Sequence, residues 1–387
     1  MTATVLPHPV RLLLLTRSLN YGGSERQLTA LAKGLQKRGG SVAVATFYPG
    51  GSLRKELESS GVSVESLSKR ARWDVLGFFW RLLKLVRRSQ PTVLHGYLAT
   101  ANILTVLLKP FYPSAIIVWG LRASNMELER YGHVDQIQAW IECKLSHFAD
   151  VIVVNSHAGF DFADRRGFPQ DRMVVIPNGI DVDRFHPDSV SRHKLRQAWG
   201  VSDQEQLIGL VGRLDPMKGH DTFIKAAGLL SQGRQNVRYL CVGDGPEAFK
   251  QKLVALSKEF GLEHRLIWVS ACDDVGDIYN ALDLVTSCSS YGEGFSNVIG
   301  EALACGRPCV VTDVGDAGRI VGDTGYIVVP GSPPALASAW EKALDAGDVE
   351  KASRSQRARE RVIAHFSLER LIEDTSRMLE TAVKAQV

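Results

Sequence analysis

The sequence predicts an α/β fold built on parallel sheets. Short apolar segments, such as RLLLLT at 11–16 and LIGLV at 207–211, alternate with longer segments that have the apolar spacing of helices. Glycine-rich and charged stretches follow several apolar segments, at the position where open α/β sheets bind ligands. A chain of 387 residues is long enough for two or three domains of ordinary size.

The composition is that of a globular protein, with 45% hydrophobic and 23% charged residues. No apolar run approaches the roughly 18 residues of a membrane-spanning helix. The opening MTATVLPHPVRLLLLT lacks a basic segment and a cleavage site, so it predicts a first strand, not a signal peptide. Six scattered cysteines in mostly apolar contexts predict buried thiols in the cytoplasm. Cys305 and Cys309 have no further Cys or His at ligand spacing, so they predict no metal site.

The charge is distributed unevenly along the chain. Residues 1–187 carry 23 Lys and Arg against 15 Asp and Glu, a net charge of +8, whereas residues 188–387 carry 23 against 27, a net charge of −4. A basic first half indicates an anionic partner. The aromatic and basic motifs of nucleic-acid-binding modules are absent, so a nucleic-acid partner is not expected.

The first strand, at 11–16, leads into NYGGSERQ and a helix that ends at Gly39. Gly22 and Gly23 let the backbone approach a ligand closely, and Ser24 is the expected helix cap. A tight turn without a ligand is the alternative. Strands are expected next at 41–47 and 62–67.

Lys69–Ser89 is expected to be a helix rich in Trp, Phe and Leu. Four cations lie towards its end: Arg81, Lys84, Arg87 and Arg88. One interpretation is an interfacial helix that contacts anionic lipid. The other is an ordinary helix covering the sheet, with its cations favoured by the helix dipole.

Three more strands are expected before the first domain ends. TVLHGYLATANILTVLL predicts a strand, a loop with His95 and a helix, AIIVWGL predicts a strand before a loop, and ADVIVVN predicts a strand before a helix capped by Ser156. His95 is a candidate for the ligand site, although a lone His is more often structural. Asp181 and Asp183 spell a DxD pattern, which we interpret as hinge and cap chemistry, not as a metal site.

The second half repeats the alternation of strands and helices. Strands are expected at 207–211, 238–242, 266–269, 284–287 and 309–312, and the tail at 335–386 is expected to be mostly helical. VGDGP at 242–246 lacks the GxGxxG pattern, so a nicotinamide site is not expected.

Two stretches of the second half carry candidate chemistry. VGRLDPMKGHD places Arg213 and Lys218 just after a strand, where two cations suit a diphosphate. SSYGEGFSNVIGEALACGRP places Glu293 in a loop and Glu301 in a helix for which Ser296 is the expected N-cap. Backbone N–H groups at the start of that helix form a natural anion site. A solvated loop Glu and a surface helix Glu are the alternative.

These motifs resemble the retaining, nucleotide-sugar-dependent glycosyltransferases of family 4. The resemblance rests on five motifs in the family's order: GGSERQ, PNGID, GRLDPMKGHD, VGDGP and YGEGFSNVIGEALACGRP. It implies the GT-B fold, two Rossmann-like, doubly wound domains that face a central cleft. We therefore expect an acceptor-side domain at 1–187, a donor-binding domain at 188–365 and a last helix at 366–387 that crosses back onto the first domain.

The resemblance also implies roles for residues. Arg213 and Lys218 would take the diphosphate charge, Glu293 the sugar hydroxyls and Glu301 the ribose hydroxyls. The other donor contacts would be Gly22, Gly23, Gly294, Phe295, Ser296 and Asn297. Several family members carry a His at the loop that reads LRASN here, so either Arg122 or Asn125 replaces it or the local alignment differs. These two residues and His95 are the acceptor-side candidates.

The expected activity is retaining transfer of a hexosyl group from a nucleoside-diphosphate sugar to a hydroxyl. A lipid-linked glycan or a cell-surface polysaccharide precursor is the expected acceptor, reached on the cytoplasmic face of the membrane. No metal or other cofactor is expected, because Arg and Lys fill the charge-stabilising role. A nucleotide-sugar epimerase of the same fold and a non-catalytic subunit remain alternatives. A glycosidase is disfavoured, because it needs no diphosphate-binding cations.

Overall fold

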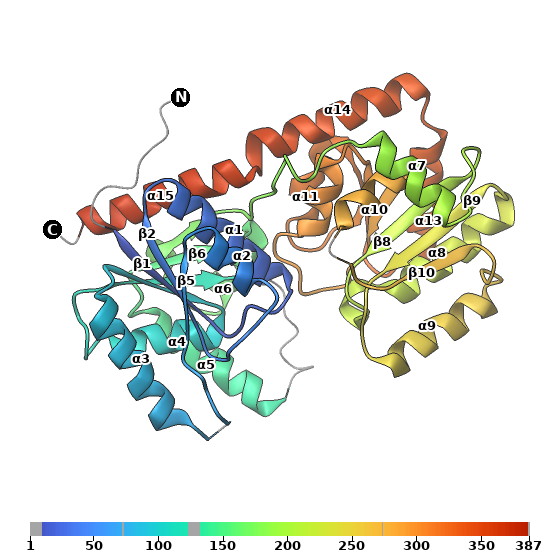
Figure 1. Ribbon diagram of the computed structural model, residues 1–387. Coiled ribbons are helices and arrows are strands. Elements are labelled where there is room, and N and C mark those ends of the chain that lie inside the picture. Colours follow the sequence, from blue (N-terminus) through green and yellow to red (C-terminus); the bar gives the residue numbers. More distant parts are fainter. Residues whose placement is uncertain (1–9, 72, 123–131, 273, 386–387) are drawn as a thin grey trace. The chain divides into compact units, whose positions relative to one another are not determined.

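The computed structural model describes residues 10–71, 73–122, 132–272 and 274–385, and the chain divides into two domains (Figure 1). The N-terminal domain comprises Met1–Gly179 together with Leu368–Val387, and the C-terminal domain comprises Ile180–Ser367. The division therefore falls inside the PNGID segment, earlier than the expected boundary at 187, and the last helix belongs to the N-terminal domain. Each domain has its own parallel sheet, as the sequence predicts.

The N-terminal sheet has seven strands in the order β3-β2-β1-β4-β5-β6-β7, and every pair is parallel. Its strands are β1 (Arg11–Thr16), β2 (Ser41–Thr46), β3 (Ser63–Ser66), β4 (Val93–Tyr97), β5 (Ile116–Leu121), β6 (Val151–Val154) and β7 (Met173–Val175). The apolar run of β1 is unbroken because both faces of the strand are buried. Leu12 and Leu14 enter the core on one face of the sheet, and Leu13 and Leu15 enter the core on the other.

Helices cover both faces of this sheet. They are α1 (Gly23–Lys37), α2 (Arg54–Ser59), α3 (Val75–Ser89), α4 (Ala99–Leu108), α5 (His133–Ser146), α6 (His157–Arg165) and α15 (Leu368–Lys384). One core contains buried leucines of α1, α2 and α15, and the other contains apolar side chains of α3, α4, α5 and α6. The sheet is thus doubly wound, because the chain turns back at β1 and β4.

The C-terminal sheet has six parallel strands in the order β10-β9-β8-β11-β12-β13. They are β8 (Gln206–Val211), β9 (Val237–Val242), β10 (Leu266–Val269), β11 (Leu284–Ser287), β12 (Cys309–Thr312) and β13 (Tyr326–Val328). Five of these strands are the expected ones. The short edge strand β13 is missing from the sequence-based prediction, because three residues carry too little periodicity to be recognised.

The C-terminal helices also pack on both faces of their sheet. They are α7 (Ser189–Ala198), α8 (His220–Gly233), α9 (Glu247–Glu259), α10 (Val275–Ala281), α11 (Asn297–Ala304), α12 (Ala317–Val321), α13 (Pro333–Asp345) and α14 (Asp348–His365), with a 3₁₀ turn at Pro216–Lys218. The core on one face contains α10, α11 and α14, and the core on the other contains α8 and α13. Trp340 is fully buried in the second core, where its indole N–H donates to Thr286 Oγ1 over 2.9 Å.

Helix α15 packs against α1 in the N-terminal domain. Ile372 lies so close to Gly34 that a Cβ at Gly34 would be 2.1 Å from its Cδ1 atom. Leu371, Ile372 and Leu379 are buried in the same core as the α1 leucines, and Arg38, the C-cap of α1, forms an ion pair with Glu369. In the part of the chain that the structure describes, no helix is long and apolar enough to cross a bilayer.

Replacing Leu379 by Ala should lower the free energy of unfolding by about 2–5 kcal/mol, because it removes a fully buried side chain and leaves a cavity under α15. The melting temperature and the urea midpoint measure this loss. Thr381→Ala, at an exposed position on the same helix, is the matched control and should change stability by less than about 0.5 kcal/mol. Equal stability of the two variants would show that α15 is not held by this packing.

Candidate functional site

The candidate site of the C-terminal domain lies where the strand order reverses, between β8 and β11. The chain proceeds from β8 to β9 and β10 on one side, and from β11 to β12 and β13 on the other. The loops that leave the carboxyl ends of β8 and β11 therefore diverge and leave a crevice, the usual ligand position in such sheets. Both motifs of the second half begin in these two loops.

The loop after β8 is fixed by its own backbone geometry. Asp215 caps the 3₁₀ turn by accepting a hydrogen bond from the Met217 N–H over 3.0 Å. Gly219 has φ +69°, and a Cβ there would be 2.1 Å from the carbonyl oxygen of Cys288. Only glycine tolerates both the positive φ and the close approach to this carbonyl oxygen. The close approach at Gly219 places the preceding residue, Lys218, beside the end of β11.

Lys218 and Glu293 are brought together by these two loops. Their side chains form an ion pair, and Ser289 Oγ donates to the same Glu293 oxygen over 2.7 Å. The side chains of Lys218 and Glu293 are 21% and 12% exposed, so the pair is largely shielded from water but open to a ligand. A backbone bond of 2.8 Å from the Ser290 N–H to the Met217 carbonyl links the same loops.

Arg213 occupies a different environment. Its side chain is 68% exposed, and its guanidinium lies 3.1 Å from Asp215 Oδ2. Of the two expected diphosphate-binding cations, Lys218 is thus fixed in the crevice, whereas Arg213 is held by a surface carboxylate. The structure adds Asp215 and Ser289 to the site. Both lie inside the two motifs, yet neither is recognised as a partner from the sequence.

Glu301 is buried in α11, where its side chain faces α10. It is 3% exposed, and Tyr279 donates a hydrogen bond of 2.9 Å to its Oε2 atom. Tyr279 lies in a different helix and has no local sequence signal that connects it to Glu301. The hydrogen bond from Tyr279 therefore orients the Glu301 carboxylate.

The loop between Glu293 and α11 is held by close backbone contacts. Gly315 has φ +63°, and a Cβ there would be 2.4 Å from the Glu293 carbonyl oxygen. Phe295 is buried and packs edge-to-face on Phe366, with ring centroids 5.3 Å apart. Phe295 can therefore serve a ligand only through its backbone. Asn297 begins α11 directly after this loop.

Ser296 corrects one expectation. It occupies the N-cap position of α11, but its side chain makes no capping hydrogen bond. The N–H groups of the first helical turn have no partner within the helix, which leaves this end suited to an anion.

The glycines of VGDGP pack against the loop after β8. A Cβ at Gly243 would be 2.1 Å from the Gly212 carbonyl oxygen, and one at Gly245 would be 2.3 Å from the Leu214 carbonyl oxygen. These glycines therefore support the site by allowing two backbones to touch. The DxD pattern is also structural, because Asp181 Oδ1 accepts hydrogen bonds from the N–H groups of Asp183 and Arg184 over 3.1 and 3.0 Å.

The N-terminal domain reverses its strand order between β1 and β4, and its candidate residues lie at this reversal. Gly22 is the N-cap of α1 and has an extended backbone, so Ser24 lies inside the helix and does not cap it as expected. Gly23 is the first residue of the helix. Glu25 follows in the first turn, where burial raises the pKa of its carboxyl group.

His95 lies within β4 and not in a loop, which corrects the expected position. It is 1% exposed, and among the described residues neither ring nitrogen has a hydrogen-bond partner. Burial, with a smaller contribution from the charge of Arg122, lowers the pKa of His95 to about 3. The imidazole is therefore neutral at physiological pH.

Arg122 lies beside the same residues at the end of β5. Its guanidinium is 4.3 Å from the centre of the Tyr97 ring, and its Nη1 atom donates to Asn178 Oδ1 over 3.2 Å. The structure thus brings Arg122, Tyr97 and His95 together, since the rings of His95 and Tyr97 are 5.4 Å apart. Asn125, the other candidate of this loop, lies outside the described residues.

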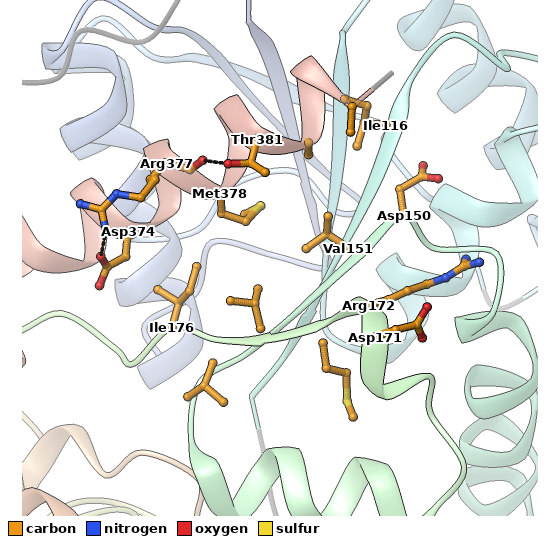
Figure 2. Close-up of a pocket in the computed structure, with 15 residues that line it drawn as sticks. Ile116, Asp150, Val151, Asp171, Arg172, Ile176, Asp374, Arg377, Met378 and Thr381 are labelled. Atoms are coloured by element: carbon orange, nitrogen blue, oxygen red, sulfur yellow. Dashed lines mark hydrogen bonds and ion pairs between the residues drawn. The ribbon is translucent and has the colours of Figure 1, made fainter. Parts of the chain in front are cut away.

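A cavity of about 700 Å³ lies elsewhere in the N-terminal domain, between α15, the amino ends of β5 and β6, and the whole of β7 (Figure 2). Its apolar lining includes Val151, Ile176 and Met378. Two of its charged groups have partners within the domain: Arg172 donates to the Ala149 carbonyl oxygen over 2.7 Å, and Asp150 lies 2.8 Å from Lys109 Nζ. The lining contains none of the predicted site residues.

Two family models match the chain. The model described as Glycosyltransferase Family 4 matches residues 21–184, and the model described as Glycosyl transferases group 1 matches residues 205–346. Together they cover most of both domains.

Curated relatives include D-inositol 3-phosphate glycosyltransferases. The protein from Rhodococcus opacus (strain B4) is 33% identical over 191 residues, which are 46% of this chain and 42% of that protein. The protein from Salinispora tropica is 30% identical over 244 residues, which are 58% of this chain and 50% of that protein. The chain thus matches half or less of the length of these relatives.

Solved structures resemble the whole chain. The structure of Anabaena Alr3699/HepE in complex with UDP has a TM-score of 0.85 at 23% identity, covering 96% of this chain and 100% of that one. Sucrose-phosphate synthase from Thermosynechococcus elongatus has a TM-score of 0.81 at 19% identity, covering 97% and 100%. These likenesses establish the fold, and with the two parallel sheets they confirm the expected GT-B class.

The buried His95 should make stability depend on pH. Its pKa is about 3 in the folded protein and about 6.5 when unfolded, so the unfolded state binds the extra proton as the pH falls below about 6.5. Between pH 6 and 4, wild type should therefore lose about 1.4 kcal/mol per pH unit more than His95→Asn. Urea unfolding across pH measures both slopes. They should coincide above pH 7, where His is neutral in both states, and equal slopes at acidic pH would contradict the assignment.

Proposed function

Because the chain belongs to the family 4 glycosyltransferases of the GT-B fold, we propose that it transfers a sugar from a nucleoside-diphosphate sugar to an acceptor hydroxyl with retained anomeric configuration. One observation carries this proposal. Lys218, Glu293 and Ser289 meet at the reversal of strand order, beside the helix that contains the buried Glu301. The site therefore combines one fixed cation, Lys218, with two carboxylates, Glu293 in a loop and Glu301 in the helix that follows it.

The proposed roles follow from the chemistry of the donor. Departure of the nucleoside diphosphate places negative charge on a phosphate oxygen, and Lys218 with Arg213 stabilises that charge together with N–H groups from Gly294 to Asn297. A diphosphate competes with Glu293 for Lys218. Once Lys218 turns to the phosphate, the Glu293 carboxylate can accept hydrogen bonds from sugar hydroxyls. Glu301, oriented by Tyr279, accepts hydrogen bonds from the ribose.

The proposed reaction needs no protein nucleophile. The bond from the sugar C1 to the phosphate oxygen breaks, and the acceptor oxygen bonds to C1 on the same face. The leaving phosphate takes the acceptor's proton. We expect no metal requirement, because Lys218 and Arg213 provide the positive charge, and turnover in the presence of EDTA tests this point.

Relatives and acceptor chemistry guide the choice of substrates. Solved structures of Anabaena Alr3699/HepE contain UDP or UDP-glucose, so uridine diphosphate sugars are the first donors to test. We propose a lipid-linked glycan or a polysaccharide precursor as acceptor, in keeping with the basic residues 1–187. Inositol 3-phosphate enters the panel because curated relatives carry that name.

Gly22, Gly23, His95 and Arg122 are the proposed substrate contacts of the N-terminal domain. Six free cysteines support a cytoplasmic location.

Lys218→Ala and Arg213→Ala should each lower turnover by about 100-fold or more, because each removes one charge stabiliser of the leaving group. Lys225→Ala is the matched control. Its ammonium lies on α8, 3.8 Å from Asp221 and outside the crevice, so its loss should leave turnover unchanged. Full activity of Lys218→Ala would remove Lys218 from the mechanism.

Glu301→Gln should reduce the rise in melting temperature that a nucleoside diphosphate produces, because an amide replaces one acceptor for the ribose. Glu341→Gln is the control, since it makes the same substitution at an exposed position of α13 and should retain the full rise. A panel of nucleotides and nucleotide sugars, without metal, identifies the base. If wild type shows no rise with any of them, the donor site is disproved and a non-catalytic role is favoured. Conversion of the donor sugar to its epimer would indicate an epimerase instead.

A further inference from the structure

Gly120 lies near the end of β5, shortly before Arg122. A Cβ at Gly120 would be 3.4 Å from His95 Nε2 and 3.5 Å from Tyr97 Cδ2. Gly120 therefore lies against the two rings that meet beside Arg122 at the carboxyl edge of the N-terminal sheet. The position of its backbone determines where the chain leaves the sheet, and thus how the Arg122 guanidinium lies over the Tyr97 ring.

The side-chain amide of Asn102 holds both polar groups of the Gly120 backbone. Asn102 Oδ1 accepts a hydrogen bond from the Gly120 N–H over 3.2 Å, and Asn102 Nδ2 donates to the Gly120 carbonyl oxygen over 3.3 Å. Asn102 is fully buried in α4, and it lies this close to the sheet because Gly96 of β4 has no side chain. A Cβ at Gly96 would be 2.8 Å from Asn102 Oδ1. One amide thus fastens the end of β5 to the start of α4.

Leu98 adds a further hydrogen bond to Gly120. Its N–H donates to the same Gly120 carbonyl oxygen over 3.2 Å. Leu98 is the N-cap of α4 and has φ +72°, a backbone conformation that is uncommon for any residue except Gly. Strain of this kind persists only where the surrounding contacts hold it, and it is concentrated at functional sites. The junction between α4 and β5 is therefore fixed in spite of its cost in backbone strain.

Glu142 of α5 determines which way the Asn102 amide points. Glu142 is 6% exposed, and its Oε1 atom accepts a hydrogen bond from Asn102 Nδ2 over 3.2 Å. Because a carboxylate oxygen accepts hydrogen bonds and does not donate them, the amide nitrogen must face Glu142, which leaves Asn102 Oδ1 for the Gly120 N–H. Burial raises the pKa of the Glu142 carboxyl group, whereas the hydrogen bond from Asn102 and the charge of Arg166 lower it. Arg166 Nη2 lies 3.9 Å from Glu142 Oε2.

We propose that Asn102 and Glu142 are positioning residues for the transfer reaction. They hold the end of β5 and thereby fix Arg122 beside His95. Both are buried, so they act through the strand and do not touch the substrate. The inference rests on the proposed function, in which Arg122 and His95 contact a substrate. Fixed placement matters there, because a displacement of about 1 Å in a group that positions a substrate lowers the rate by about 100-fold.

Swapping the amide and the carboxyl group between the two positions tests the pair in the full chain. Asn102→Asp removes the donor to Gly120 and places two carboxyl groups together, so turnover should fall about tenfold or more. The swapped variant, Asn102→Asp with Glu142→Gln, should recover most of this loss, because the introduced Gln can donate to the introduced Asp. Gln138→Ala is the matched control. It removes another hydrogen bond between α4 and α5, from Gln138 Nε2 to Thr100 Oγ1 over 3.4 Å, and should leave turnover unchanged.

A double-mutant cycle with Arg122→Ala shows whether Asn102 acts through Arg122. In the Arg122→Ala background, Asn102→Asp should lower turnover by less than about twofold, because the group that it positions is already absent. The rise in melting temperature that uridine diphosphate produces should stay at the wild-type value in Asn102→Asp, since Lys218 and Glu293 lie in the other domain. Losses that multiply in the double variant, or no recovery in the swapped variant, would overturn the proposal.

Hydrogen exchange follows the pair without any substrate. The backbone amides at the end of β5 should exchange at least about fivefold faster in Asn102→Asp than in wild type, and the swapped variant should return them towards the wild-type rate. Unchanged exchange in Asn102→Asp would show that Asn102 does not hold Gly120 and would overturn the proposal. Absence of transfer by wild type with every donor is a failure of the proposed function. It is distinct from equal turnover of wild type and Asn102→Asp, which is a failure of this inference alone.

Discussion

The reversal of strand order in each parallel sheet is the constraint on which the rest of the structure depends. In the C-terminal sheet it makes β8 and β11 neighbours although they are far apart in the chain. Their loops leave the same edge in opposite directions, which opens the crevice that holds Lys218 and Glu293. The glycines of these loops follow from the same constraint. Gly219, after β8, lies too close to the Cys288 carbonyl for any side chain, and Gly315, in the loop after β12, lies too close to the Glu293 carbonyl of the β11 loop.

The electrostatics of the site follow from this crowding. The ion pair of Lys218 with Glu293 is largely buried, and the Ser289 hydroxyl donates a hydrogen bond to the same carboxylate. A pair of this kind holds both side chains at the crevice without a ligand, and it can be divided between a phosphate and sugar hydroxyls. The N-terminal reversal carries a different chemistry. There, burial keeps His95 neutral beside Tyr97 and Arg122.

The two faces of the N-terminal sheet also differ in what they present outward. Helix α15 helps to close one face through Leu371 and Leu379, whereas α3 and α5 expose aromatic rings on the other. Helix α3 begins at Val75, later than the expected start at Lys69, and it covers the sheet as one interpretation of Lys69–Ser89 predicts, whereas contact with lipid stays a prediction. Phe78, Leu82 and Val86 cover the sheet, and the opposite side of the same helix carries Leu76 and Trp80 towards solvent. A helix with two apolar sides packs one side on the sheet and, among the residues that the structure describes, leaves Leu76 and Trp80 on the second side exposed.

The sequence by itself determined the parallel α/β class, most strand positions and the two motifs, because each depends on short-range periodicity and on residues close in the chain. It did not reveal β13, the position of His95 inside β4, or the helix start at Gly23, since boundaries depend on packing more than on local preference. Only the tertiary structure decided that Tyr279 holds Glu301, and that α3, α4, α5 and α6 share one core. Those partners are distant in the chain, and the strand order that joins them is set by burial of both sheet faces, which no local pattern encodes.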